Sequence, residues 1–329
     1  MKWKNCLIDL HLHLDGSLSL ASARVLAKLQ GIQIPESDEE LLTLLSVEED
    51  CRDLNVYLQK FAFPGMLLQT ETALTAAVST LLAELKEQGL IYTEIRFAPQ
   101  KHRDKGLTQR QVIEAAIAGL RDEILPAGLI LCCMRGGENR EANLETVRLA
   151  KEYLGRGVVA IDLAGAEGLF PTADFAEVFA LAGELEVPCT IHAGEGDGPE
   201  SVRTALRFGA KRIGHGVRSA EDGALLRELA EQGVTLECCP TSNLQTRVFA
   251  DIREYPVRTF LGAGVKFTIN TDNLSVSATN LQREWRLILD AFALTDDEIK
   301  TILLHAAEAA FAPAEEKRRL REKIEAAFA

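Results

Sequence analysis

Four of the six histidines in this 329-residue chain follow short apolar segments that have the character of strands. His11 and His13 form an H-x-H pair, and alternate residues of a strand project to the same side. His192 follows a second apolar segment, and Asp272 follows a third. Three imidazoles and one carboxylate suit zinc, with one position left for water. These four residues therefore predict one zinc ion per chain.

Two further polar residues have a spacing suited to acid–base chemistry. Glu195 lies three residues after His192, and Gly194 permits a tight turn that brings the carboxylate back over the metal. The fourth strand-end histidine, His215, has glycines on both sides, which leave room for a ligand. Zinc lowers the pKa of its bound water toward roughly 7. His215 could hold the hydroxide, Asp272 could accept the proton of the water, and Glu195 could protonate the electrophile. This set predicts metal-assisted hydrolysis of a C–N bond.

Each of these residues also has a plainer interpretation. The H-x-H pair could be polar filling of a barrel mouth, Glu195 could be a solvated loop acid, and His215 could be a capping or core residue. His102 and His305 lie in a predicted loop and a predicted helix, and we leave them outside the site. The concentration of four histidines at strand ends favours the metal interpretation over polar packing.

Eight short apolar segments supply the elements that must position these side chains. They are continuous rather than alternating, as expected for parallel strands buried on both faces. From the third segment onward their starts recur roughly every 22 to 31 residues, about one βα unit each. This spacing predicts an α/β fold, a (β/α)₈ barrel whose functional residues lie at the carboxyl ends of the strands. The segments are Cys6–Leu10, Ile91–Phe97, Gly128–Met134, Val158–Leu163, Pro188–His192, Arg212–His215, Val234–Cys238 and Val265–Asn270.

The long interval between the first two segments predicts a helical insertion, at about residues 19–90, over the mouth of the barrel. We expect one domain over residues 1–329, with additional helices at the C-terminal end. Inside the insertion, Leu54, Leu58 and Phe61 share one helical face, and Pro64 is expected to end that helix. This apolar face could pack on the barrel. Other helical patterns cover residues 70–88, 138–153, 199–208 and 313–329.

Composition and charge limit the class of partner. The formal net charge of −13 argues against nucleic acid or an anionic membrane surface as the main partner. No stretch approaches the roughly 18 consecutive apolar residues of a membrane helix. The N-terminus has no apolar signal core, and the seven cysteines include no C-x-x-C pair. A cytoplasmic protein with reduced thiols and a small-molecule substrate is predicted, and no pattern indicates an oligomeric state.

Taken in order, the motifs resemble the adenosine deaminase family of the amidohydrolase superfamily over nearly the whole chain. Residues 239–243 are similar to the bacterial branch of that family. Residues 158–165 lack the lysine that bridges two metals in binuclear relatives, so one zinc ion is expected. The resemblance implies a barrel that converts adenosine to inosine and ammonia and also accepts 2′-deoxyadenosine. The matching segments are residues 11–16, 94–99, 162–165, 192–195, 212–216 and 271–272.

The resemblance also assigns the catalytic and metal-binding roles. His11, His13, His192 and Asp272 would bind zinc, and Glu195 would donate a proton to N1 of a purine. His215 would orient the hydroxide that attacks the ring.

Residues of the substrate pocket follow from the same resemblance. Asp15 would contact the ribose, although an Asp before a helix is also an N-cap signal. The Gly165 N–H would meet purine N3, although Gly165 could be needed only for its turn. His13 would also face the substrate, and Leu58 and Phe61 would form an apolar gate over the purine, excluding water.

Asn273 departs from the animal members of the family, which carry a second Asp at this position. The Asn273 amide can donate to purine N7 without a proton of its own, whereas an Asp must be protonated to do so. Asn273 could instead only cap the turn after the last strand. Two other functions remain open. One is deamination of a related aminopurine, such as adenine or a 5′-modified adenosine, and the other is purine binding without catalysis.

Overall fold

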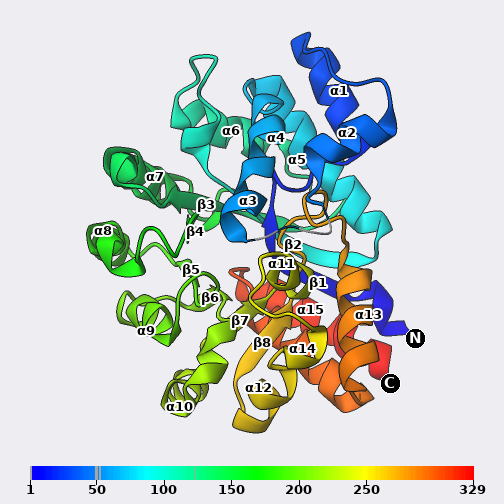
Figure 1. Ribbon diagram of the computed structural model, residues 1–329, viewed down its shortest axis with the longest axis vertical. Helices are drawn as coiled ribbons and strands as arrows, with labels where there is room; N and C mark the ends of the chain where they lie inside the picture. The colour runs from blue at the N-terminus through cyan, green and yellow to red at the C-terminus, as the bar shows by residue number, and fades with distance from the viewer. Residues whose placement is uncertain (1, 49–50, 52, 122) are drawn as a thin grey trace.

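Eight parallel strands form the centre of the molecule in the residues that the computed structural model describes, which are 2–48, 51, 53–121 and 123–329 (Figure 1). They confirm the eight strand predictions, with ends shifted by at most three residues. The strands are β1 (Leu7–His13), β2 (Leu90–Phe97), β3 (Ala127–Met134), β4 (Val158–Ala164), β5 (Thr190–Ala193), β6 (Arg212–His215), β7 (Thr235–Cys238) and β8 (Lys266–Ile269).

The strands pair in sequence order, first β1 to β4 and then β5 to β8. The two groups meet at both edges, where Ile161 bridges to Cys189 and Leu12 bridges to Asp272, each in parallel. At the second of these edges the Asn270 side chain accepts a hydrogen bond from the Leu10 N–H at 3.0 Å. The fold is therefore the predicted (β/α)₈ barrel, in which the carboxyl ends of all strands share one rim.

Helices surround the strands, as Figure 1 shows. Their starts agree with local signals: Thr108 with Gln111, and Thr295 with Glu298, form capping boxes before α6 and α14. The outer helices are α5 (Glu71–Glu87), α6 (Gln109–Gly119), α7 (Arg140–Tyr153), α8 (Ala176–Glu184), α9 (Pro199–Arg207), α10 (Gly223–Gln232), α11 (Pro240–Gln245), α12 (Val257–Ala263), α13 (Leu281–Phe292), α14 (Asp296–Ala309) and α15 (Ala314–Phe328). Short 3₁₀ turns are η1 (Lys2–Asn5), η3 (Pro99–Lys101), η4 (Gly137–Asn139), η5 (Thr172–Phe175), η6 (Val217–Glu221) and η7 (Ile252–Glu254).

In the described part of the segment between β1 and β2, four further helices precede α5. They are α1 (Leu20–Gln30), α2 (Asp38–Leu45), α3 (Leu54–Leu58) and α4 (Ala62–Met66), with the 3₁₀ turn η2 (Gln59–Phe61) between α3 and α4. The prediction that Pro64 ends a helix was wrong. Pro64 lies in the first turn of α4, where the backbone N–H that proline lacks has no partner within the helix to lose.

The barrel interior contains charged side chains where the strand pattern suggested apolar packing. Arg96 contacts Asp162 at 2.9 Å and Glu237 at 2.8 Å, and Arg212 contacts Glu94 and Glu237, each at 2.6 Å. All five side chains are at most 1% exposed. Each charge therefore has a partner of opposite sign, as burial in a barrel requires.

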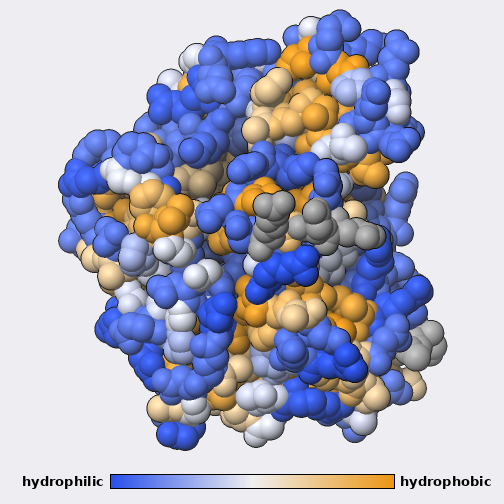
Figure 2. Space-filling view, viewed as in Figure 1, coloured by the Kyte–Doolittle hydropathy of each residue, from blue (hydrophilic) through white to orange (hydrophobic). Residues whose placement is uncertain are grey.

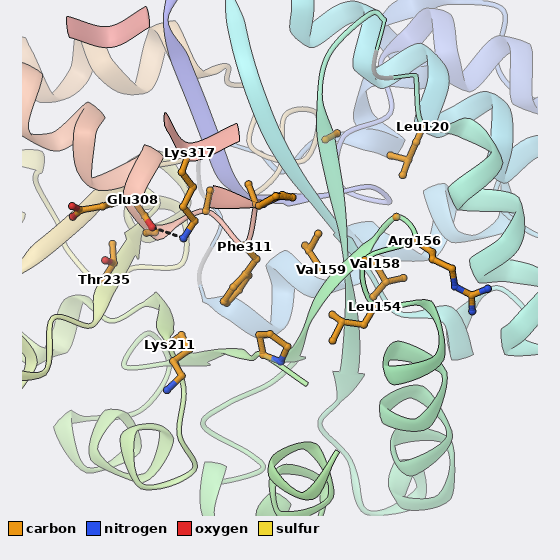
Figure 3. Close-up of a pocket in the computed structure, with 18 of the residues that line it drawn as sticks. Leu120, Leu154, Arg156, Val158, Val159, Lys211, Thr235, Glu308, Phe311 and Lys317 are labelled. Atoms are coloured by element: carbon orange, nitrogen blue, oxygen red, sulfur yellow. Dashed lines mark hydrogen bonds between the residues drawn. The ribbon is translucent and has the colours of Figure 1, made fainter. Parts of the chain in front are cut away.

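A wide cavity of about 1100 Å³ lies at the opposite end of the barrel, beside the amino ends of β4, β7 and β8. Figure 3 shows Phe311, Leu154 and Val158 on its walls. Two of its cationic groups have partners, because Lys266 pairs with the Glu308 carboxylate and Lys317 donates to the Glu308 carbonyl oxygen, both at 2.8 Å. This end of the barrel has none of the predicted metal-binding residues.

The surface drawn in Figure 2 is mainly hydrophilic, with apolar residues over α1 and α4 and, below the centre of the view, around α11. Among the described residues, no single helix has the length and apolar character needed to cross a membrane. One bent pair of helical segments, Leu54–Met66 with Glu71–Glu87, is together long and apolar enough, by length and composition only.

Candidate functional site

The four predicted metal ligands lie together at the carboxyl ends of β1, β5 and β8. His11 Nε2 and His13 Nε2 are each 3.3 Å from Asp272 Oδ1, and His13 Nε2 is 3.3 Å from His192 Nε2. Ligand atoms at about 2.0–2.1 Å from a tetrahedral metal are about 3.3–3.4 Å apart. These three distances therefore match the spacing of atoms that share one metal ion. All four residues belong to a group whose potential ligand atoms lie within 4.8 Å of one another.

Two carboxylates behind the histidines fix the orientation of the rings. Glu237 Oε2 is 2.8 Å from His11 Nδ1, and Asp162 Oδ2 is 2.8 Å from His192 Nδ1. Glu237 accepts the Nδ1 proton of His11 and the Asp162 carboxylate lies beside His192 Nδ1, so both Nε2 atoms are left to donate electron pairs toward the metal position. Because Arg96 bridges Glu237 and Asp162, the orientation of the two rings is coupled through one guanidinium.

Backbone geometry also brings Asp272 to the group. Asp272 has a φ of 60°, a left-handed conformation that is uncommon for a residue with a side chain. Its N–H donates to the His11 carbonyl oxygen, and its own carbonyl oxygen accepts from the His13 N–H, both at 2.8 Å. These two hydrogen bonds join the segment after β8 to β1, and they offset the cost of the strained backbone conformation of Asp272.

The pKa shifts of His11, His13 and Asp272 favour the forms that bind metals, whereas that of His192 has the opposite direction. Burial lowers the pKa of His11 to about 4 and lowers the pKa of His13 well below its usual range. Burial opposes ionisation of Asp272, but the hydrogen bond and charge of His11 outweigh it and lower the Asp272 pKa. Burial also opposes a charge on His192, whose pKa is nevertheless raised because Asp162 lies beside it. Neutral imidazoles and an ionised carboxylate are the forms that coordinate metals.

Glu195 and His215 lie next to the metal group and face each other. His215 Nε2 is 3.5 Å from Glu195 Oε2, and Thr246 Oγ1 donates to Glu195 Oε1 at 3.2 Å. Burial, with the charge of Asp272, raises the pKa of the Glu195 carboxyl, despite the opposing effect of His215. A buried carboxyl with a raised pKa is suited to donating a proton near neutral pH.

Asn243, to which the sequence motifs assigned no role, sets the tautomer of His215. The Tyr255 hydroxyl donates to Asn243 Oδ1 at 3.0 Å, so the Asn243 amide nitrogen faces His215 Nδ1 at 3.1 Å. Because an amide nitrogen only donates, His215 Nδ1 accepts and the ring proton resides on Nε2, toward Glu195. The signal for Asn243 was its place in the motif of residues 239–243.

A cavity of about 520 Å³ opens above this group, and the structure brings nearly all predicted site residues to it. His11 is the exception, since it lies below the cavity floor and is fully buried. Burial raises the pKa of Asp15 to about 6, and its Oδ1 atom is buried without a hydrogen-bond partner in the described residues. The predicted residues that line the cavity are His13, Asp15, Leu58, Phe61, Gly165, His192, Glu195, His215, Asp272 and Asn273.

Tyr57 is a cavity residue that the helical-face analysis missed. It is 2% exposed on α3, and its hydroxyl contacts the Ser277 hydroxyl at 2.6 Å and accepts from Asn273 Nδ2 at 3.0 Å. Gly16 packs directly against the same amide, because a Cβ atom built on Gly16 would lie 1.7 Å from Asn273 Oδ1. Asn273 is thus held between α3 and the end of β1. His102, placed outside the site, lies fully buried in the cavity wall, and burial lowers its pKa to about 4.

These features define a class, the (β/α)₈ barrels with a His₃Asp group that can hold a metal ion and an adjacent acid at the carboxyl ends of the strands. A family model described as adenosine deaminase matches residues 6–327, and the chain belongs to that family. An adenosine deaminase of Haemophilus ducreyi is 51% identical over 322 residues, covering 95% of this chain and 94% of the relative. One of Enterococcus faecalis is 39% identical, with 98% and 96% covered. The crystal structure of an Arabidopsis N6-mAMP deaminase, 27% identical, superposes with a TM-score of 0.86 and covers 99% of this chain and 100% of its own.

Proposed function

We propose that this protein is a zinc-dependent adenosine deaminase that converts adenosine and 2′-deoxyadenosine to the inosine products and ammonia. One observation carries the proposal: the His₃Asp group lies on the floor of a cavity that also holds Glu195 and His215. The relative of Haemophilus ducreyi, 51% identical and named adenosine deaminase, supports adenosine as the substrate.

His11, His13, His192 and Asp272 would hold the zinc ion, because their ligand atoms lie close enough together to share one metal ion. Bound zinc supplies a Lewis acid that makes water acidic near neutral pH. The low pKa of Asp272 keeps its carboxylate ionised, so it can accept a proton from the attacking water.

Glu195 and His215 divide the remaining proton chemistry. Glu195 donates its proton to purine N1, which draws electron density from C6 and makes that carbon electrophilic. The raised pKa of Glu195 supports this role, since an ordinary glutamate carries no proton at neutral pH. His215 carries its proton on Nε2 and orients the attacking water through that atom.

The other cavity residues orient the nucleoside. Asp15 has an unpartnered buried oxygen that can accept from a ribose hydroxyl, and the Gly165 N–H would donate to purine N3. Asn273 would donate to N7 through the second hydrogen of its amide, since the first is given to Tyr57. Leu58 and Phe61 of the 54–66 segment would cover the purine and exclude water, and His13 would contact the substrate from below.

The test is a substrate panel followed by ultraviolet absorbance and zinc analysis. Adenosine and 2′-deoxyadenosine should be deaminated far faster than adenine, AMP or N6-methyl-AMP. The last two are included because the Arabidopsis neighbour is an N6-mAMP deaminase. Preferential turnover of adenine or a 5′-phosphorylated substrate would assign the alternative aminopurine function. Binding without turnover of any member would leave only the purine-binding interpretation.

A cytoplasmic location agrees with the reduced state of the Cys132, Cys133, Cys238 and Cys239 thiols.

A further inference from the structure

Glu167, in the loop after β4, binds the loop after β5 through an unusually complete set of hydrogen bonds. Its Oε2 atom accepts from the backbone N–H groups of Glu195, Gly196 and Asp197 at 3.0, 2.7 and 3.1 Å. Its Oε1 atom accepts from the Gly194 N–H at 2.8 Å and from the Ser201 hydroxyl. The Glu167 residue is only 2% exposed.

Four consecutive N–H groups that converge on one point form a backbone concavity for anions. In this protein the anion is a carboxylate of the chain itself, so the concavity is occupied and does not bind substrate. Gly194 permits the required turn with a φ of 74°. Gly196 permits the close approach of the two loops, because a Cβ atom on it would lie 3.2 Å from the Gly168 nitrogen.

The same contacts fix the backbone of the acid on both sides. The Glu195 N–H donates to Glu167, and the Glu195 carbonyl oxygen accepts from Arg218 Nε at 3.0 Å. With the backbone held, the Glu195 carboxyl is placed between the His215 ring and the Thr246 hydroxyl.

We propose that Glu167 is a positioning residue for the deamination, and that its carboxylate holds the 194–197 loop so that Glu195 points at the substrate. This inference rests on the proposed function, because it assumes that Glu195 is the proton donor. Glu167 has no place in the cavity lining and acts only through the loop.

The chemistry of the contacts requires a carboxylate at this position. All five partners are hydrogen-bond donors, and an ionised carboxylate only accepts. Its two oxygens have about four lone-pair sites, so two of the five donors share one site. A glutamine of the same shape has one acceptor oxygen, and its NH₂ group would face N–H or O–H donors. Glu167→Gln should therefore release part of the loop while preserving the volume of the side chain.

The first experiment measures kcat and KM of Glu167→Gln for adenosine, together with zinc content and melting temperature. A 1 Å misplacement of a reacting group can reduce the rate by about 10²-fold. We expect kcat to fall by about 10- to 100-fold, KM to change by less than about threefold, and zinc to stay at the wild-type level. The matched control is Glu177→Gln, since Glu177 is half exposed on α8 and pairs with the exposed Arg140. Its kinetics should equal those of the wild type.

A double-mutant cycle with Glu195→Gln separates positioning of the acid from a general structural role. If Glu167 acts through Glu195, Glu167→Gln should reduce kcat by less than about twofold once the Glu195 carboxyl is gone. If the kcat losses of the two single variants multiply in the double variant, the inference is overturned. A wild-type kcat in Glu167→Gln would also overturn it.

A variant that removes a single donor covers the case in which Glu167→Gln fails to fold. Ser201→Ala deletes one of the five contacts and should reduce kcat by about 2- to 10-fold with little change in melting temperature. An unchanged kcat in Ser201→Ala would then count against the positioning role. A wild-type protein that deaminates no substrate would refute the proposed function, whereas an active wild type with a fully active Glu167→Gln variant refutes this inference alone.

Discussion

Gly16→Ala should displace Asn273 and thereby test the contact to purine N7. The added Cβ would lie 1.7 Å from Asn273 Oδ1 and 2.5 Å from its Cγ, whereas real Cβ contacts essentially never fall below 3.0 Å. The Asn273 amide must therefore move by more than about 1 Å, away from the position that Tyr57 and Gly16 now define. A buried acceptor left without its donor costs about 1–3 kcal/mol. At about 1.4 kcal/mol per decade, kcat/KM for adenosine should fall roughly 5- to 150-fold.

The assay compares adenosine with 7-deazaadenosine, which has carbon in place of N7, on wild type, Gly16→Ala and Asn273→Leu. Both variants should lose more activity on adenosine than on the analogue, because the analogue makes no contact at that position. Gly262→Ala is the control, since no atom lies within 4 Å of its added Cβ, and its kinetics should match the wild type. Equal losses on both substrates would remove Asn273 from purine recognition, and full activity of Gly16→Ala would contradict the packing argument.

Three further predictions concern the metal, the acid and a buried carboxyl. His192→Ala should lose zinc and turnover together, and an elemental analysis with full zinc and a near-normal rate would refute the ligand assignment. Glu195→Gln should retain zinc and nucleoside binding while kcat falls at least about 10²-fold, so a rate within a few fold of wild type would remove Glu195 as the acid. Glu284 is fully buried and accepts from the Thr241 N–H at 2.9 Å, and burial raises its pKa from 4.5 to about 7. The Glu284 pKa is higher in the folded state than in the unfolded state, so the contribution of this group to the free energy of unfolding is fully present below about pH 4.5. That contribution, up to about 3 kcal/mol, is lost as pH rises through about 7. Urea unfolding between pH 5 and 8 should therefore show a flatter pH dependence for Glu284→Gln, and an unchanged slope would contradict the assignment.

The strands and the metal group were predictable because they depend on local patterns. A strand buried on both faces requires a continuous apolar segment, and the period of two in β1 places His11 and His13 on one side. The order of the segments then forced His192 and Asp272 onto the same rim, because all strands of the barrel run in one direction.

The supporting residues were not predictable, because their partners are distant in sequence. Glu237 is 226 positions from His11, and Glu167 is 27 positions from Gly194. Arg96 lies in an apolar segment, where a single charge gives no indication of the carboxylates that meet it across the barrel. Tyr57 lies three residues after Leu54 on the same short helix, but its role depends on the Ser277 hydroxyl and the Asn273 amide, which are 220 and 216 positions away in sequence.

The buried ion network inside the barrel restricts how this sequence can vary. Glu237 contacts both Arg96 and Arg212, so replacing it alone would leave each of these buried cations with one carboxylate partner in place of two. Removing one partner of a buried pair costs about 3–5 kcal/mol, a large part of the roughly 5–15 kcal/mol stability of a typical protein. A variant with only one of these residues replaced would therefore fold poorly. Only simultaneous replacement of several of them would keep every charge paired. The cost of an unmatched charge therefore makes these interior residues depend on one another, whereas exposed ion pairs, which contribute little to stability, are not linked in this way.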